Sequence, residues 1–442
     1  MSNNTEKKGL NISAKSFITA IGVIFVLMVL TYGLTFVVPG GEIPFWKWIA
    51  SPVLVLGGED NISLIAVLIF LLVIGGVFNC LDKCGLMKYM LDKITYRFGK
   101  ERYKLLALVT LFFMAMGSFI GSFEECVPLV PIVVALAIRL GWDALVGMGM
   151  SLLAIGCGFA AGVCNPFTVG VAQELAGLPM FSGMWFRAVA FLLVYALLVK
   201  FLYHYAKRIE KPLEVGVTED GFVAKPKMDK GLVCFASIMV CGIAIVLSSV
   251  VVTALQDYTM IVVAVTFLGA GIASSLVSGM GGRLGKVFWN GLVSVLPAVL
   301  MILMANSIKY TLVEGNILDT ILQAAVSTAE NLPRWAVILF IHLIVLVMNF
   351  FIASGSAKAF LLMPLIVPVA EVFGISAQLC VVAYAFGDGF SNVFYPTNPV
   401  LLISLGLADV DYGKWVKWSW KFQVMNLLLT SGILMLGLVI GY

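Results

Sequence analysis

The chain has few charged side chains: Asp, Glu, Lys and Arg make up 12% of its 442 residues, whereas soluble domains carry roughly 25%. It contains only two histidines, His204 and His342, which lie too far apart in sequence to suggest a metal site. Its eight cysteines show neither zinc-type spacing nor the pattern of a secreted disulfide framework. We therefore expect the cysteines to pack as apolar side chains, and we do not expect a water-soluble or disulfide-rich fold.

Motifs for nucleotide, phosphate or covalent chemistry are missing as well. The sequence contains no phosphate loop, no dinucleotide-binding fingerprint, no metal-ligand cluster and no pairing of a nucleophile with a base. We therefore expect a protein that is not an enzyme, does not bind nucleic acid and holds no resident cofactor.

Apolar residues dominate what is present. They make up 61% of the chain, and many runs reach about 20 residues, the length that spans a bilayer as a helix. The sequence thus predicts an all-α polytopic membrane protein with about nine transmembrane helices. Their expected ranges are 16–38, 62–81, 144–178 (interrupted), 185–203, 231–255, 260–280, 289–313, 376–407 (interrupted) and 422–442.

Two longer apolar regions do not fit a simple span. Residues 105–140 carry Gly-Ser-Phe-Glu-Glu at 121–125, and residues 335–373 carry Ser-Gly-Ser-Ala-Lys at 354–358. Each region is long enough for two half-helices with a polar tip between them. This is the pattern of a re-entrant hairpin.

Two stretches of the chain match each other at a constant offset of 233 residues. Gly156 pairs with Gly389, and the Asn-Pro step at 165–166 pairs with the one at 398–399. Because these residues break helices, their matches mean more than matches of Leu or Val in so apolar a chain. Secondary transporters are commonly built from such repeats, with the binding site at broken helices where the repeats meet.

The distribution of Lys and Arg indicates the orientation, since cytoplasmic loops are rich in them. Residues 82–104 and 204–230 are rich in basic side chains, whereas 39–60 and 314–332 are poor in them. This places the N-terminus in the cytoplasm, opens the first hairpin to the cytoplasm and opens the second to the outside. The two repeats are therefore predicted to be inverted, and 16–38 is expected to be a retained helix rather than a signal peptide.

The expected organisation follows from these assignments. Residues 1–203 form the first inverted repeat, 204–230 a cytoplasmic linker, and 231–442 a linker helix with the second inverted repeat. The parts of the repeats are scaffold helices at 16–81 and 260–313, amphipathic arms at 86–101 and 317–331, hairpins at 105–140 and 335–373, and broken helices at 144–178 and 376–407. Each arm is either an interfacial helix or a link between a mobile hairpin domain and a static one.

Ionisable residues at the hairpin tips are the first candidates for a binding site. Glu124 and Glu125 would lie at bilayer depth, where charged groups are costly and mark functional sites. The repeat mate of Glu125 is Lys358. An acid at one tip and a base at the other suggest either a salt bridge or a two-ended site for an amino group and a carboxylate. The alternative is an ordinary solvated loop.

The helix breaks supply the second group of candidates. Proline removes a helical hydrogen bond, so freed carbonyls and Asn side chains there could bind Na⁺, and the amides of the resuming half-helix could hold a carboxylate. Asp388, one turn before Asn392, could bind a proton or cation. The alternative is a pair of structural kinks without a ligand. The substrate candidates are Ser122, Glu124, Glu125, Asn165, Thr168, Ser354, Ser356, Lys358, Asn392, Thr397 and Asn398, and the coupling-ion candidates are Asp388 and Glu125.

Four motifs resemble a known group of carriers: Glu-Glu-Cys-Val-Pro-Leu-Val-Pro-Ile (124–132), Cys-Asn-Pro-Phe-Thr-Val-Gly (164–170), Ser-Gly-Ser-Ala-Lys-Ala (354–359) and Phe-Gly-Asp-Gly-Phe-Ser-Asn (386–392). Over most of its length the chain resembles the YfcC-like branch of the DcuC-type carriers. These belong to the ion transporter superfamily, together with the AbgT transporters and the divalent anion/sodium symporters. The resemblance implies a homodimer in the inner membrane whose transport domain moves against a scaffold like an elevator.

The tips of the chain depart from those of the sodium/dicarboxylate members, which carry Ser-Asn-Thr there. The branch that the chain resembles is associated with basic amino acids and arginine/ornithine exchange. We therefore expect a secondary transporter of a small amino acid, preferably cationic, that works by exchange or is driven by Na⁺ or H⁺. The alternatives are a carrier of a C4-dicarboxylate or other small carboxylate, which would use Lys358 and the half-helix dipoles, and a channel.

Overall fold

The computed structural model describes residues 14–38, 41–57, 61–121, 123–179, 181–212, 224–248, 259–317, 320, 328 and 332–442. Within these ranges the regular elements are all helices and no strand is formed. Among the described residues, six helical segments are long and apolar enough to cross a bilayer: Leu86–Phe119, Met184–Ile209, Gly281–Glu314, Arg334–Phe351, Gly355–Val372 and Tyr412–Ile440. The prediction of an all-α polytopic membrane protein is confirmed.

The first half of the chain contains long helices and several short helical segments. Their bounds are α1 Ala14–Thr35, α2 Phe45–Leu54, α3 Asn61–Lys83, α4 Leu86–Phe98, α5 Arg102–Ala115, η3 Met116–Ile120, η4 Glu124–Leu129, α6 Val130–Arg139, α7 Ala144–Met148, η5 Gly149–Leu153, α8 Ala154–Ala160, η6 Pro166–Gly170, α9 Val171–Leu175 and α10 Met184–Ile209. Short one-turn segments lie at η1 Val55–Gly57 and η2 Gly99–Glu101.

The second half follows a similar order. Its elements are α11 Pro226–Ser248, α12 Thr259–Val277, η9 Gly281–Arg283, α13 Leu284–Ser294, α14 Leu296–Glu314, α16 Arg334–Phe351, α17 Gly355–Val372, α18 Ala377–Gly389, η10 Phe390–Val393, α19 Pro399–Ala408 and α20 Tyr412–Ile440. Each broken helix therefore stops after one half-helix, runs through an irregular stretch and resumes at an Asn-Pro step. Proline is favoured at the first helical position, because it has no N–H that would lose a partner there.

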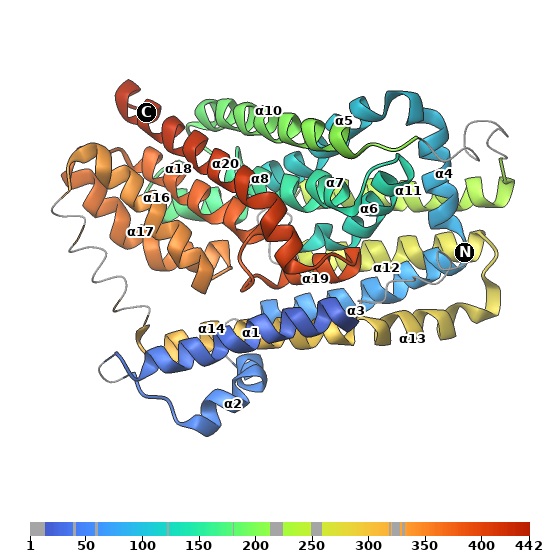
Figure 1. Cartoon of the computed structure of the whole chain (residues 1–442), viewed down its shortest axis with the longest axis horizontal. Coiled ribbons are helices and arrows are strands. Elements are labelled where there is room, and N and C mark those ends of the chain that lie inside the picture. The colour runs from blue at the N-terminus through green and yellow to red at the C-terminus, as the bar shows by residue number, and fades with distance from the viewer. Residues whose placement is uncertain are drawn as a thin grey trace.

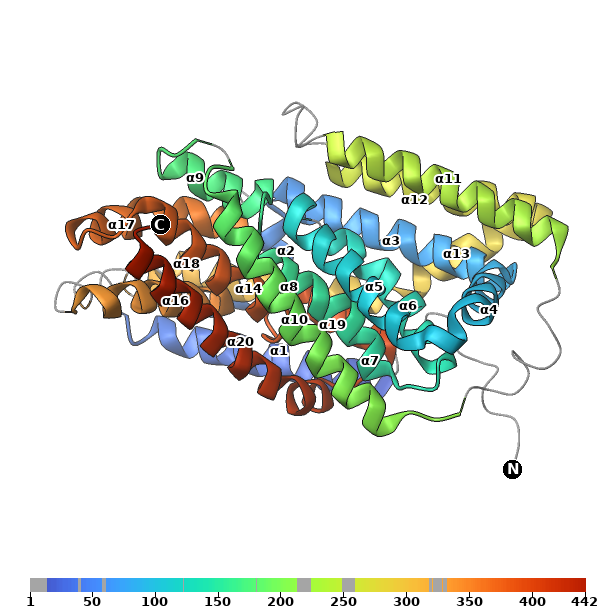
Figure 2. The ribbon, with the colours of Figure 1, turned by 90° about the horizontal axis from the view of Figure 1, so that it is seen from above.

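The helices divide into two groups, and in Figure 1 α1–α3, α13 and α14 lie below α5–α10 and α16–α20, whereas α11 is drawn at the height of α6 and α7 and packs on α12. One group contains α1–α3 and α11–α14, and the other contains α5–α10 and α16–α20. Each half of the chain contributes to both groups. The hairpin of α5 and α6 lies toward one end of the long axis, and the hairpin of α16 and α17 lies toward the other (Figures 1 and 2).

One expected span is interrupted in the structure, one expected external segment contains a helix, and one expected arm lies mostly outside the described residues. The segment 39–60, expected to lie on the outer side, contains α2, whose Trp48 Nε1 donates a hydrogen bond to the Met28 carbonyl at 3.2 Å. The expected span 289–313 is interrupted at Val295, two residues before Pro297, so that it comprises the end of α13 and all of α14. Most of the second arm, 317–331, lies outside the described residues.

The two broken helices contact each other through glycines that are repeat mates. A side chain on Gly156 would collide with Val393, and a side chain on Gly389 would collide with the backbone of Ala160. Ala160 and Val393 are also separated by the repeat offset, so the two contacts are reciprocal. Reciprocal contacts of this kind occur across a two-fold axis. The absence of side chains at both positions lets α8 and α18 approach closely.

Candidate functional site

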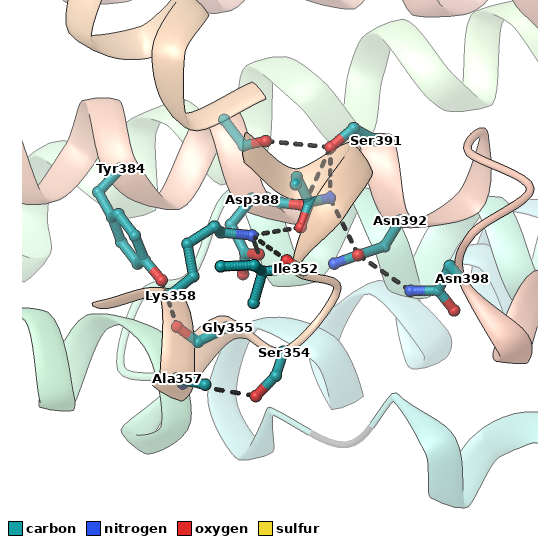
Figure 3. A network of polar contacts seen from close by, with 12 residues as sticks. Ile352, Ser354, Gly355, Ala357, Lys358, Tyr384, Asp388, Ser391, Asn392 and Asn398 are labelled. Atoms are coloured by element: carbon teal, nitrogen blue, oxygen red, sulfur yellow. Dashed lines mark hydrogen bonds and ion pairs between the residues drawn. The ribbon is translucent and has the colours of Figure 1, made fainter. Parts of the chain in front are cut away.

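The tip of the second hairpin is fixed to α18. Ser354 accepts a hydrogen bond from the backbone N–H of Ala357 at 3.4 Å and so caps α17. The hydroxyl of the buried Tyr384, on α18, donates to the backbone carbonyl of Gly355. These contacts place Lys358, in the first turn of α17, beside the C-terminal end of α18 (Figure 3).

Lys358 and Asp388 form a fully buried ion pair at this tip. Their side chains are 0% exposed, and Nζ of Lys358 lies 2.5 Å from Oδ1 of Asp388. The same Nζ donates to Oδ1 of Asn349 and, at 3.3 Å, to the carbonyl of Ile352. The three N–H groups of the ammonium thus have three oxygen acceptors. Removing one partner of such a pair costs about 3–5 kcal/mol, because the remaining charge is buried without compensation.

Three asparagines connect the ion pair to the second helix break. Asn349, at the end of α16, donates from Nδ2 to Oδ1 of Asn392 at 3.0 Å, and Asn398 donates to the same oxygen at 3.0 Å (Figure 3). Asn398 in turn accepts from the backbone N–H of Val400 at 2.9 Å and caps α19. A continuous hydrogen-bonded chain therefore runs from Lys358 to the N-terminus of α19.

The first helix break is held by uncharged hydrogen bonds. Asn165 accepts from the backbone N–H groups of Phe167 and Thr168 at 2.9 and 3.3 Å, and its Nδ2 donates to the carbonyl of Gly117 at 3.3 Å. The buried hydroxyl of Ser118 donates to a carbonyl of the break at 2.8 Å and accepts from an N–H of the break at 3.0 Å. The break is thereby tied to the end of η3, the last part of the first hairpin before its tip.

A side chain from the next long helix holds one carbonyl in each break. Arg187 of α10, which is 1% exposed, donates from Nε and Nη2 to the carbonyl of Val163 at 3.1 and 3.0 Å. Trp415 of α20 donates from Nε1 to the carbonyl of Val393 at 2.7 Å. The carbonyls of Val163 and Val393, which the helix breaks leave without a helical partner, therefore already accept hydrogen bonds from side chains of the protein.

The two repeats meet at Gly355. A β-carbon added to Gly355 would lie 2.6 Å from Cγ2 of Thr168 and 2.8 Å from Oδ2 of Asp388, so both side chains lie directly against this glycine. Oδ2 of Asp388 and Oγ1 of Thr168 are buried and have no hydrogen-bond partner among the described residues. Buried polar atoms are nearly always partnered. Two such oxygens at the boundary of the repeats mark a place where a hydrogen-bond donor could bind.

The candidate residues from the sequence fall into different surroundings. Ser122 and the side chains of Glu124 and Glu125 lie outside what the structure describes, although η4 includes the backbone of both glutamates. Ser354 is exposed, Ser356 is half-buried, and Thr397 is buried with no partner for its hydroxyl among the described residues. The structure brings together Lys358, Asp388, Asn392 and Asn398, with Thr168 adjacent and Asn165 capping the half-helix that carries Thr168.

The structure differs from the sequence predictions in the partner of Lys358 and in what the half-helix amides bind. The sequence allows a salt bridge between Lys358 and Glu125, whereas the partner of Lys358 in the structure is Asp388. The first amides of both resuming half-helices, expected to receive a carboxylate, already bond the oxygens of Asn165 and Asn398. The side-chain oxygen of each Asn therefore occupies the place at the N-terminus of its half-helix where a carboxylate would bind.

Sequence analysis missed three residues that build the site: Asn349, Tyr384 and Arg187. Asn349 is a polar residue near the end of a long apolar run, which is a signal in a membrane helix. Its repeat mate is Met116, so a search for matched polar pairs does not find it. Tyr384 lies one turn before Asp388 on α18, Arg187 lies away from the breaks in sequence, and packing brings both side chains to the site.

Comparison with known proteins gives a family match over most of the chain. Residues 51–439 match the family described as "DcuC: C4-dicarboxylate anaerobic carrier". A protein of Escherichia coli (strain K12), named "Putative basic amino acid antiporter YfcC", is 29% identical over 408 residues, which cover 87% of this chain and 80% of that protein. An uncharacterized protein of Haemophilus influenzae is 25% identical over 398 residues, covering 85% of this chain and 76% of that protein.

Two solved structures match the chain over most of its length at low sequence identity. The YdaH transporter of Alcanivorax borkumensis has a TM-score of 0.49 and 17% identity, covering 96% of this chain and 99% of that chain. MtrF of Neisseria gonorrhoeae, from a class of antimetabolite efflux pumps, has a TM-score of 0.46 and 15% identity, with 94% of each chain covered.

Proposed function

The chain belongs to the DcuC family of membrane carriers, and we propose that it is a secondary transporter of a small amino acid, with cationic amino acids such as arginine or ornithine as the preferred substrates. The name of the E. coli relative, a basic amino acid antiporter, supports this choice of class. Exchange of one amino acid for another, or coupling to a cation gradient, would drive the movement.

The observation that carries the proposal is the free oxygen of Asp388. Oδ1 of this carboxylate binds Lys358, while Oδ2 is buried beside Thr168 and lacks a partner among the described residues. Carboxylate and hydroxyl oxygens accept hydrogen bonds from an ammonium or guanidinium group. Opening of the second hairpin at Gly355 would uncover both oxygens for a substrate amino group. Glu124 and Glu125 would add negative charge from the first hairpin.

A C4-dicarboxylate is the second candidate, because the family description names that substrate class. Such a carrier would need cationic or N–H donors that are free to bind two carboxylates. The ammonium of Lys358 has all three of its donors engaged in this conformation, and the N-terminal amides of both resuming half-helices are capped. These contacts favour the amino acid.

The arrangement of the helices supports an elevator movement between two inverted repeats. The hairpins lie toward opposite ends of the long axis, and the broken helices make reciprocal contacts at Gly156 and Gly389 (Figures 1 and 2). The group of α5–α10 and α16–α20 would be the moving domain, and α1–α3 with α11–α14 the scaffold. We infer a homodimer in the inner membrane, with the N-terminus in the cytoplasm.

Thermal unfolding of the purified protein tests the substrate class, since a ligand that binds only the folded state raises its stability. Arginine or ornithine should raise the unfolding temperature, and succinate should not. Asp388→Asn should weaken the amino acid affinity by at least about tenfold, because a charged acceptor is lost. The matched control is Glu371→Gln, which removes an exposed carboxylate from α17. Stabilisation by succinate alone, confirmed by succinate counterflow in liposomes, would establish the dicarboxylate instead.

A further inference from the structure

The ammonium of Lys358 occupies an oxygen cage. A carboxylate oxygen of Asp388, the amide oxygen of Asn349 and the backbone carbonyl of Ile352 surround Nζ. Lys358, Asp388 and Asn349 are each at most 1% exposed, and the carbonyl of Ile352 belongs to the extended tip of the hairpin. Carboxylate, amide and unwound backbone oxygens at a helix break are the ligands that hard cations take.

We propose that this cage is a monovalent-cation site of the second repeat and that Lys358 fills it with a cation tethered to the chain. The carrier would then close its second hairpin without taking up Na⁺ at this position. This proposal concerns the ion in the cage and not the transported molecule, so it can be tested without a substrate.

Comparison of the two repeats supports a special role for this cage. At the repeat offset, Ile155 stands where Asp388 stands and Met116 stands where Asn349 stands. The first repeat therefore has apolar residues in place of two of the three ligands. Its hairpin is joined to its helix break by the uncharged contacts of Ser118 and Asn165 instead. Among the residues that the structure describes, the charged cage is found in the second repeat and not in the first.

The tether has a physical consequence for the hairpin. Lys358 lies on α17, whereas Asp388 lies on α18, and Tyr384 joins the same two helices through the carbonyl of Gly355. A free Na⁺ could leave the cage when the hairpin opens, and closure would then depend on the Na⁺ concentration. A tethered ammonium cannot leave the chain. Closure of the hairpin is therefore expected to be independent of Na⁺ at this site.

Removal of the tether should turn the cage into a Na⁺ site. We would measure thermal unfolding of the full-length protein in NaCl and in choline chloride at equal ionic strength. Lys358→Ala leaves a carboxylate and room for an ion, so Na⁺ should raise its unfolding temperature by a few degrees more than that of the wild type. Lys358→Met fills the same space without a charge and should show no added response. The double variant Lys358→Ala/Asp388→Asn has no net charge in the cage and should also show none.

The salt dependence of these variants either supports or overturns the proposed cation site. A Na⁺ response that is equal in the wild type and in Lys358→Ala overturns the proposal. A Lys358→Ala variant that aggregates in both salts, while the double variant remains folded, overturns it as well, because Na⁺ at high concentration then fails to compensate Asp388. Folding of Lys358→Ala in NaCl but not in choline chloride supports it. None of these results depends on whether the carrier moves an amino acid or a dicarboxylate.

Discussion

Gly355 is the residue at which the smallest change should have a large effect. Its missing side chain leaves the tip in contact with Thr168 and Asp388, and a methyl group would lie 2.6 and 2.8 Å from their side chains. Overpacking of this kind costs about 1–3 kcal/mol. We expect Gly355→Ala to lower the unfolding temperature and to impair transport by holding the tip away from α18.

The control at the residue scale is Gly432→Ala on α20, where an added β-carbon meets nothing within 4 Å. Alanine has a higher helix propensity than glycine by about 1 kcal/mol, so this variant should be as stable as the wild type or more stable. Equal unfolding temperatures and transport rates for the two variants would show that the tip tolerates a side chain and that the contact at Gly355 is loose.

Among the elements, the half-helix α19 depends for its stability on its N-terminal cap, Asn398. The Asn398 side chain both caps the N-terminus of α19 and bonds Asn392, and it thereby connects the helix break to Lys358 and Asp388. Loss of a cap costs about 0.5–2 kcal/mol. We expect Asn398→Ala to lose this stability and also to weaken binding of the stabilising amino acid, measured by ligand-dependent thermal unfolding.

Asp411→Ala is the matched variant for this prediction, since Asp411 caps α20 through the N–H of Lys414 at 3.2 Å and is not part of the asparagine chain. It should lose a similar amount of stability and keep its ligand affinity. If both variants bind the ligand as tightly as the wild type, the asparagine chain has a purely structural role.

For the whole molecule, the decisive prediction is that the two hairpins open to opposite sides of the membrane. Lys100, next to the start of α5, and Glu371, near the end of α17, are both exposed. In a background without native cysteines, which removes the exposed Cys241, a membrane-impermeant maleimide should label Glu371→Cys in intact cells. Lys100→Cys should be labelled only after permeabilisation. Labelling of both from the same side would contradict the inverted repeats.

The sequence by itself determined the class of protein and the places where its helices stop. Low charge and apolar runs of about 20 residues predict membrane spans whatever the packing is. These spans must be helical, because unpaired backbone groups cannot face lipid. The Asn-Pro steps at 165–166 and 398–399 restart the helices for an equally local reason, since Asn caps the new half-helix and proline at its first position has no N–H that needs a partner. The repeat offset also located the reciprocal glycines Gly156 and Gly389, whose contact depends on a missing side chain.

Only the tertiary structure decided which groups share a site. Lys358 and Asp388 lie on different helices, and hydropathy or helix periodicity cannot specify which buried charges meet when the helices cross. Arg187 was missed for the same reason, because it acts on a segment that packing brings to it. The breaks are local properties of the chain, whereas the oxygen cage around Lys358 exists only because α16, α17 and α18 converge at one hairpin tip.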